Sequence, residues 1–382
     1  MEEWKKYVLS DIADIVTGKT PSTKEVSYFG GSIHFITPGD INKGLKHVYS
    51  TERTLTESGL QAIRGSAVNA NAICVSCIGN IGYVGMSTMR CATNQQINTL
   101  IVKDGFDEDF VYYLIKYLWP EFKNFEGQST TLSILNKGQF SKIQVRVPSL
   151  ALQKQIAAVL SSIDDKIELN NRINHNLEEQ ARHHFDEWCR SCNEEKSIAE
   201  LSFNILDYSQ NQRDKVILLN SSDVTEGIFK TLPYVENKDL KGQFKKRFRK
   251  GDILYSEIRP RNHHYAICYF NAKDYIASTR LMIIRRNPEL LSSDALLYQY
   301  LLMPRVEEEF TSKTESRSGT FPQGNYEDLS SSVVPYSREN QIISKTLDAL
   351  YSIIWLNMEE NKRLASFRDA LLPLLMSGDL TC

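Results

Sequence analysis

The sequence predicts an α+β fold: two mixed α/β globules separated by two long helices that pack as an antiparallel coiled coil, with a pseudo-twofold internal repeat. The first observation behind this is that the helical segment after Val147-Pro148 resembles the segment after Val334-Pro335. The second is that both segments place apolar residues at 4,3 spacing, which is typical of a coiled coil. The third is that short β-branched runs, separated by Gly, Asn, Asp and Ser turns, precede each helix.

Each globule is predicted to contain short strands followed by one amphipathic helix. The first globule covers residues 1–146 and the second covers residues 193–333, and the segment Ile73 to Gly79 of the first resembles Ile253 to Arg259 of the second. The expected strands lie at 33–36, 72–78, 97–102, 216–219 and 281–284, and the expected helices near 107–119 and 293–303.

The two long helices are predicted within residues 147–192 and 334–382. Their apolar seams can both be buried if the helices pack antiparallel on each other. The first seam runs through Ile156, Leu160, Ile163, Ile167, Asn170, Asn174, Leu177, Ala181, His184 and Trp188. The second runs through Ile343, Leu347, Leu350, Ile354, Asn357, Asn361, Leu364, Arg368, Leu371 and Leu375.

Four asparagines interrupt these seams: Asn170, Asn174, Asn357 and Asn361. A polar residue inside a seam fixes the helix register, because a slipped pairing would bury an unsatisfied amide. The four are therefore candidates for setting register. The alternative is that they lie at the solvated edge of the seam.

Composition excludes several classes of protein. Lys and Arg number 45 and Asp and Glu number 47, a near balance that argues against a basic tail protein or an acidic disordered chain. No apolar run approaches the roughly 18 residues of a membrane span. The seven scattered cysteines are typical of reduced thiols, so we expect a cytoplasmic protein that does not enter a membrane.

The motifs that could indicate an enzyme are weak. Residues 13–20 fit a relaxed phosphate-loop pattern, but the first Gly is missing and β-branched residues stand where backbone amides would curl around phosphate. The glycines of 79–85 have the wrong spacing for a dinucleotide fold. The pairs Cys74/Cys77 and Cys189/Cys192 lie in different elements, unlike a zinc ribbon. We therefore assign no catalytic residue and no metal ligand.

Basic residues concentrate in the second globule, where residues 241–261 carry eight of them with only Asp252 and Glu257 opposing. Such a stretch can neutralise phosphates and read base edges. A solvated basic hairpin is the alternative. The candidate DNA-contacting residues of this globule are Lys241, Lys245, Lys246, Arg247, Arg249, Arg259, Arg261, His263, Arg280 and Arg317.

The first globule has a sparser set that includes an amide-rich segment, residues 93–96, predicted as a strand. Gln and Asn read adenine when they reach a groove, although an amide ladder on a strand is the alternative. The candidates here are Lys19, Lys43, Lys46, Arg64, Gln95, Gln96, Ser129, Thr130 and Lys137.

The order globule, helix, globule, helix resembles the specificity (S) subunit of type I restriction-modification enzymes over essentially the whole chain. The resemblance rests on Leu9 to Asp14 followed by Gly18 to Ser22, on Ile36 to Ile41, on Val147 to Ile156 and on Phe367 to Leu372. The second globule departs from the pattern, because Ile36-Thr37-Pro38 becomes Leu218-Leu219-Asn220.

The resemblance implies two target recognition domains, 1–146 and 193–333, each reading one half of a bipartite, asymmetric site in double-stranded DNA. It implies that the helices, 147–192 and 334–382, are conserved spacers that dock two modification (methyltransferase) subunits, through which restriction subunits join. S-adenosylmethionine, ATP and magnesium then belong to the partners, and the chain itself needs no cofactor. The acidic first helix segment, with five basic and nine acidic residues in 147–195, fits a protein-facing role.

Two other functions stay open at this point. One is a self-contained restriction or methylation enzyme with a split recognition module, which activity of the purified chain would reveal. The other is a coiled-coil scaffold that binds no DNA, which would show no sequence preference in a gel shift with partner subunits.

Overall fold

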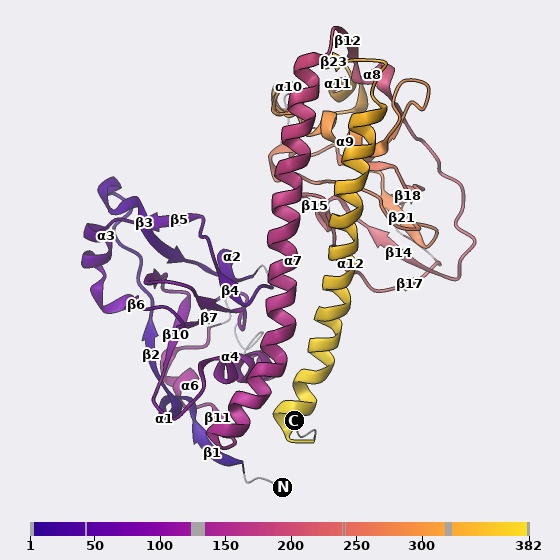
Figure 1. Cartoon of the computed structure of the whole chain (residues 1–382). Helices are drawn as coiled ribbons and strands as arrows, with labels where there is room; N and C mark the ends of the chain where they lie inside the picture. The colour runs from indigo at the N-terminus through magenta and orange to yellow at the C-terminus, as the bar shows by residue number, and fades with distance from the viewer. Residues whose placement is uncertain are drawn as a thin grey trace. The chain divides into compact units, whose positions relative to one another are not determined.

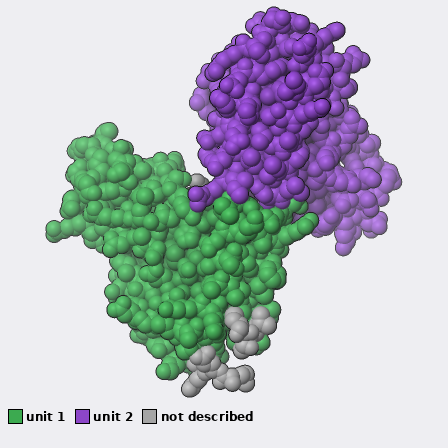
Figure 2. Space-filling view, viewed as in Figure 1, with its two compact units in different colours: residues 1–170, 359–382 green, residues 171–358 purple. Residues whose placement is uncertain are grey.

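The computed structural model describes residues 4–42, 44–123, 134–238, 240, 242–317 and 323–379. The chain divides into two compact units, one formed by residues 1–170 with 359–382 and the other by residues 171–358 (Figure 2). Two long helices, α7 (Leu150–Ser191) and α12 (Gln341–Ser377), each contribute residues to both units (Figure 1). None of the helices in the described part of the chain combines the length and apolar character of a membrane span.

The described residues of unit 1 form three sheets. A five-stranded sheet has the order β2-β10-β7-β8-β4, a four-stranded sheet has the order β5-β3-β9-β6, and β1 pairs with β11. The strands are β1 (Lys5–Val8), β2 (Ala13–Thr17), β3 (Phe29–Ile36), β4 (His47–Val48), β5 (Arg53–Leu55), β6 (Ala67–Val68), β7 (Ile73–Ser76), β8 (Val84–Ser87), β9 (Cys91–Thr93), β10 (Ile97–Val102) and β11 (Gln144–Val147). The short helices are α1 (Leu9–Ile12), η1 (Val26–Tyr28), α2 (Pro38–Ile41), α3 (Glu57–Ala62), η2 (Arg64–Ser66), α4 (Glu108–Tyr117), α5 (Trp119–Lys123) and α6 (Lys137–Ser141).

Unit 2 repeats the main strands in the same order, but its described residues include no counterpart of α3 or of the edge strand β4, and they add the hairpin β15-β16. Its main sheets have the orders β13-β22-β19-β20 and β17-β14-β21-β18, and β12 pairs with β23. The strands are β12 (Glu194–Ser197), β13 (Ser202–Asn204), β14 (Lys215–Leu219), β15 (Val224–Thr225), β16 (Ile228–Phe229), β17 (Val235–Glu236), β18 (Phe244–Lys246), β19 (Ile253–Ser256), β20 (Tyr265–Ile267), β21 (Tyr275–Ser278), β22 (Leu281–Arg286) and β23 (Val333–Tyr336). The helices are α8 (Ile198–Leu201), η3 (Ser221–Asp223), η4 (Pro260–Asn262), α9 (Asp294–Leu301), α10 (Pro304–Glu315) and α11 (Tyr326–Ser330).

The internal repeat is confirmed down to strand order and direction. The β13-β22-β19-β20 sheet repeats β2-β10-β7-β8, and the parallel pair β14/β21 repeats the parallel pair β3/β9. One detail of the repeat differs from the sequence prediction. Val147 is the last residue of β11, whereas Val334-Pro335 lies inside β23, with Pro335 opposite Glu195. The two Val-Pro steps are therefore not equivalent positions.

Each unit has its own apolar core, and the long helices complete both cores. The core of unit 1 surrounds Leu9, Ile12 and the buried face of α4, and it is closed by Ile156 and Leu160 of α7 and by Leu375 of α12. Asp107 caps α4, because its carboxylate accepts a hydrogen bond from the Phe110 backbone N–H at 2.9 Å. The core of unit 2 is completed by other parts of the same helices, among them Ala181, Phe185, Leu347, Tyr351 and Ile354.

Within each unit the two helices run antiparallel and the seam asparagines meet. In unit 1 the Asn170 Nδ2 donates to Asn361 Oδ1 at 2.8 Å, and in unit 2 the Asn357 Nδ2 donates to Asn174 Oδ1 at 2.8 Å. The predicted position of His184 in the seam is wrong: His184 is exposed and Phe185 is buried. The helix face turns there because Phe185 packs edge-on against Tyr300, with ring centres 5.1 Å apart.

Candidate nucleic-acid interface

In unit 1, two loops lie against each other at one edge. The Lys19 backbone N–H donates to Thr93 O at 2.9 Å, and the Thr20 hydroxyl donates to Gln95 Oε1 at 2.6 Å. Gly18 permits this contact, because a Cβ there would lie 2.0 Å from Asn94 O. The structure therefore brings Lys19 and Gln95 together, and both are exposed.

The amide segment is not the predicted strand. Gln95 and Gln96 form the turn between β9 and β10, since β9 ends at Thr93 and β10 begins at Ile97. A turn is less shielded than a strand inside a sheet, so Gln95 is solvent-exposed, while the Gln96 amide oxygen accepts a hydrogen bond from Asn94 Nδ2 at 2.9 Å.

A second loop of unit 1, residues 77–82, adjoins this turn. The Cys77 N–H donates to Gln96 O at 2.7 Å, and the Ser76 N–H donates to Tyr83 O at 2.9 Å and closes the loop. We name this loop and the turn 94–96 together the reading edge of unit 1. Two further predicted cations are exposed: Arg64 begins η2 and Lys137 begins α6.

Unit 2 has the same edge with other residues. The Glu257 N–H donates to Arg280 O at 3.0 Å, and the Ser256 N–H donates to His264 O at 2.9 Å. These bonds match those of Cys77 and Ser76, so Arg280 takes the place of Gln96 and residues 257–263 take the place of residues 77–82. We name residues 257–263 with Arg280 the reading edge of unit 2.

Glu257 and Gln323 organise the polar groups of this edge. The Glu257 carboxylate accepts a hydrogen bond from Gln323 Nε2 at 2.6 Å, and Arg280 Nη1 donates to Gln323 Oε1. Arg317 Nη1 donates to Gln323 O at 2.6 Å, and its Nη2 lies 2.8 Å from a carboxylate oxygen of Asp328. The structure thus gathers Arg280 and Arg317 from distant segments. Gln323 was missed in the sequence, where nothing distinguishes it from other surface amides.

Two further members of the predicted set are tied to α10. Arg261 forms a bidentate pair with Glu315, with distances of 2.7 and 2.8 Å, and the His263 Nδ1 lies 2.7 Å from Glu307 Oε1. The hydrogen bond from Arg261 lowers the pKa of Glu315. Arg259, between these anchors and Glu257, is exposed.

The basic run 245–249 does not form one surface. Lys245 and Arg249 are exposed, but Lys246 is 4% exposed and its ammonium lies 3.4 Å from Glu257 Oε1 and 2.8 Å from Leu281 O. Arg247 is half-buried, its Nη2 donates to Lys273 O at 3.1 Å, and desolvation lowers its pKa. The predicted exposure of Lys246 is therefore wrong, because the residue alternates to the inner face of β18.

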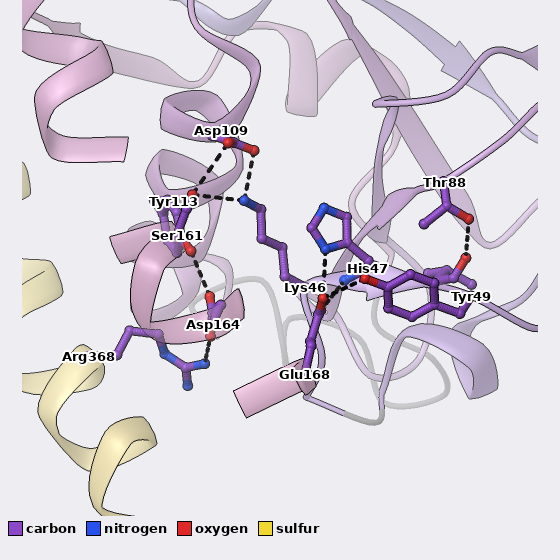
Figure 3. Close-up of polar contacts among 11 residues, drawn as sticks. Lys46, His47, Tyr49, Thr88, Asp109, Tyr113, Ser161, Asp164, Glu168 and Arg368 are labelled. Atoms are coloured by element: carbon purple, nitrogen blue, oxygen red, sulfur yellow. Dashed lines mark hydrogen bonds and ion pairs between the residues drawn. The ribbon is translucent and has the colours of Figure 1, made fainter. Parts of the chain in front are cut away.

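Lys46 is the second predicted cation that the structure removes from the surface. It is 2% exposed, and its ammonium lies 2.8 Å from both Asp109 Oδ1 and Ser161 Oγ (Figure 3). A buried ammonium with two oxygen partners is not available to a DNA phosphate. Lys46 instead joins the loop before β4 to α4 and α7.

The neighbouring residue, His47, forms a second contact with α7. Its backbone N–H and its ring Nδ1 each lie 2.8 Å from a Glu168 oxygen, and the Tyr49 hydroxyl donates to Glu168 at 2.8 Å (Figure 3). Burial opposes ionisation of Glu168, but these hydrogen bonds outweigh it and lower its pKa. His47, Asp165 and Glu168 also place one potential metal-ligand atom each within 4.8 Å of one another, the sole such group among the residues described.

Four predicted residues, Lys43, Ser129, Thr130 and Lys241, lie outside the described residues. Both cysteine pairs are free thiols, with Cys74 and Cys77 buried around the end of β7 and Cys189 and Cys192 near the end of α7. Desolvation raises the pKa of Cys77 to about 11.

Comparison with known proteins connects this architecture to one family. Residues 1–179 match the family model described as the type I restriction modification DNA specificity domain. The chain is 32% identical over 190 residues to the type I restriction enzyme MjaIX specificity subunit of Methanocaldococcus jannaschii, an overlap of 49% of this chain and 44% of that protein. It is 35% identical over 180 residues to the HindI specificity subunit of Haemophilus influenzae, an overlap of 46% of this chain and 39% of that protein. The chain thus spans less than half the length of these relatives.

One solved structure extends the likeness to the whole chain. The crystal structure of a type I restriction-modification S subunit from M. genitalium aligns with a TM-score of 0.57 and 16% identity, covering 98% of this chain and 96% of that one. At this identity the alignment shows a shared fold. Residues 1–179 thus resemble the type I restriction modification DNA specificity domain, and over its length the chain has the fold of that S subunit.

Proposed function

We propose that this chain is the DNA sequence-recognition subunit of a type I restriction-modification complex, in which each globule reads one half of a bipartite, asymmetric site. The observation that carries the proposal is the reading edge, which is built twice on one backbone plan with different side chains. Unit 1 presents the amides Gln95 and Gln96, whereas unit 2 presents Arg280 in the place of Gln96 and Arg259 in the place of Gly79.

This difference in side chains fits two readers of different sequences. Amides pair with adenine and guanidinium groups pair with guanine in the major groove, so the two edges would select different half-sites. The exposed cations beside them, including Lys19, Arg64, Lys245 and Arg249, would bind phosphates and fix orientation without selecting bases.

The partners proposed are two methyltransferase subunits docked on α7 and α12, with restriction subunits joining through the complex. The acidic composition of the first helix segment supports docking on protein rather than on DNA. In this proposal the chain is not an enzyme, and S-adenosylmethionine, ATP and magnesium act on the partner subunits. The relatives are all named as specificity subunits, which supports assigning recognition to this chain and catalysis to its partners.

The test is an exchange of the second globule. Residues 196–333 are replaced by the corresponding globule of another family member, the chain is assembled with its modification subunits, and methylated bases are mapped in genomic DNA. We expect one half-sequence to change and the other to persist. A change in both half-sequences would contradict separate readers, and methylation without any sequence preference would favour the scaffold.

A control tests the alternative that the chain is a self-contained restriction or methylation enzyme. The purified chain, supplied with S-adenosylmethionine and DNA but no partner subunit, should transfer no methyl group. Methyl transfer by the chain alone would overturn the assignment as a recognition subunit.

A further inference from the structure

Each reading edge holds two residues in the left-handed region, which are glycines in unit 1 and bulkier residues in unit 2. In unit 1 the loop 77–82 contains Gly79 at φ +80° and Gly82 at φ +93°. In unit 2 the corresponding residues are Arg259 at φ +49° and His263 at φ +51°. The closing hydrogen bonds, Ser76 N–H to Tyr83 O and Ser256 N–H to His264 O, both 2.9 Å, make these the third and last residues of their loops, and the loop of unit 2 is one residue longer.

A left-handed conformation disfavours any residue that carries a Cβ, and glycine is the residue that adopts it at no steric cost. Unit 1 has glycine at both of its left-handed positions. The second unit nevertheless holds two bulky residues there. Backbone strain of this kind persists where the surrounding structure imposes it, and it concentrates at ligand-contacting sites.

The surrounding structure here is helix α10. Arg261 is held by Glu315 through two hydrogen bonds of 2.7 and 2.8 Å, and His263 Nδ1 lies 2.7 Å from Glu307 Oε1. At the other end of the loop, Glu257 accepts from Gln323 at 2.6 Å, and its backbone N–H bonds to Arg280 O. These contacts fix the loop on both sides of Arg259, whose side chain is exposed.

We propose that the loop 257–263 selects bases for the second half-site and that Arg259 reads a guanine through its planar, two-pronged guanidinium. The inference rests on the proposed function, since it names the residue by which one reader acts. A preorganised arginine loses less freedom on binding than one on a flexible loop, and bidentate pairing with guanine O6 and N7 is the commonest specific contact in the major groove. Glu315 acts as a positioning residue, because it holds the loop through Arg261.

The test uses the assembled complex and DNA duplexes that carry its mapped site or single base-pair changes in either half. In Arg259→Gly the left-handed position becomes unstrained, so we expect an unchanged or higher unfolding temperature. Discrimination at one G·C pair of one half-site should nevertheless fall by at least about tenfold. Arg259→Lys keeps the charge and the strain but lacks the two-pronged geometry, so it should lose the same discrimination with an unchanged salt dependence.

Two further variants separate reading from folding. Asn71→Gly changes another left-handed residue, at φ +63° in unit 1, and should leave discrimination in both half-sites unchanged. Glu315→Gln should reduce discrimination in the same half-site while affinity for unrelated DNA stays constant, and Glu315→Asp should restore part of it.

The outcomes separate a failure of the inference about Arg259 from a failure of the proposed recognition function. If Arg259→Gly and Arg259→Lys select bases as the wild type does, the inference is overturned and the recognition function stands. If the wild-type complex itself shows no base preference, the proposed function fails. Loss of discrimination in both half-sites at once would also overturn the inference.

Discussion

At the scale of single residues, burial separates cations that look alike in the sequence. Lys245 and Lys246 are neighbours in β18, yet the first is exposed and the second is buried beside Glu257. Side chains alternate between the faces of a strand, so the alternation could have been read from the sequence once the strand was placed. The ion pairs of Lys246 with Glu257 and of Lys46 with Asp109 could not have been read from the sequence, because each joins residues that lie apart in the chain.

This difference predicts opposite effects for two sets of substitutions. Replacing Lys245 and Arg249 with Gln should weaken DNA binding and reduce the slope of log affinity against log salt by up to about 0.9 for each phosphate that is no longer neutralised. Lys246→Met should leave that slope unchanged and lower stability by roughly 1–3 kcal/mol, because Glu257 loses an ionic partner. Titration of binding against salt, together with thermal unfolding, measures both. A flatter slope for Lys246→Met would contradict its burial.

Glu168 predicts a dependence of stability on pH. Its pKa is lowered in the folded protein, so it contributes stability above the unfolded-chain pKa of about 4.3 and loses that contribution as pH falls through the folded pKa. We expect Glu168→Gln to be less stable than the wild type at pH 7, by roughly 1 kcal/mol, since the amide accepts the same hydrogen bonds more weakly. The difference should narrow below about pH 4.3. Chemical denaturation at pH 7, 5 and 3.5 measures it, and a constant difference would contradict the assignment.

At the scale of elements, the asparagine pairs connect α7 to α12 inside each unit. Asn170 is fully buried, and its Nδ2 donates both to Asn361 Oδ1 at 2.8 Å and to Glu360 Oε2 at 2.7 Å. A shifted helix would leave these groups unpaired among apolar side chains, at a cost of roughly 1–3 kcal/mol for each buried amide. The contacts therefore give the two helices one preferred register.

The single preferred register of α7 against α12 predicts how lengthening the helices changes stability. Seven residues inserted after Ile167 in α7 alone should lower the unfolding temperature, because the seam polar residues then face apolar ones. A matching insertion after Arg363 in α12, at the point opposite Ile167 in the antiparallel pair, should recover most of the loss. Thermal unfolding of the single and double insertions compares them. Equal unfolding temperatures for the wild type and the single insertion would show that the asparagines do not set register.

Much of the fold was predictable at this scale, and the misses have identifiable causes. The helical repeat and its asparagines follow from spacing alone, because a seam imposes a strict period. The end of the seam at His184 does not, since the buried face there is decided by Tyr300 of another element. The amides of 94–96 form a turn that the sequence does not mark, because no Gly or Pro stands between Thr93 and Ile97. At the reading edges, the sequence indicated the arginines and amides as candidates for DNA contact. It did not indicate the backbone hydrogen bonds that place Gln96 and Arg280 at equivalent positions.

At the scale of the whole molecule, the units do not follow the order of the chain. Unit 1 joins residues 1–170 to residues 359–382, and its core includes Leu372, Leu375 and Met376 from the end of α12. Arg368 of the same helix pairs with Asp164, which is 2% exposed. The last turns of α12 are thus structural parts of the globule that begins the chain.

Truncation tests this dependence. Removal of residues 359–382 should destabilise unit 1 strongly, because each buried Leu or Met removed costs roughly 2–5 kcal/mol and Asp164 loses its cationic partner. Residues 171–358 retain their own core. Hydrogen exchange should therefore show reduced protection in β7 and β10 and preserved protection in β19 and β22. Equal loss in both units would contradict two separate cores.

The same arrangement has a consequence during translation. A nascent chain ordinarily folds its first globule while later ones are still being made. Here the first globule to leave the ribosome cannot close its core until residues 372–376 have been polymerised, whereas residues 171–358 contain everything that the second core needs. The globule synthesised second is therefore the one that can be completed first. Apolar side chains such as Leu9, Ile12 and Phe110 therefore stay incompletely covered until residues 372–376 have been synthesised.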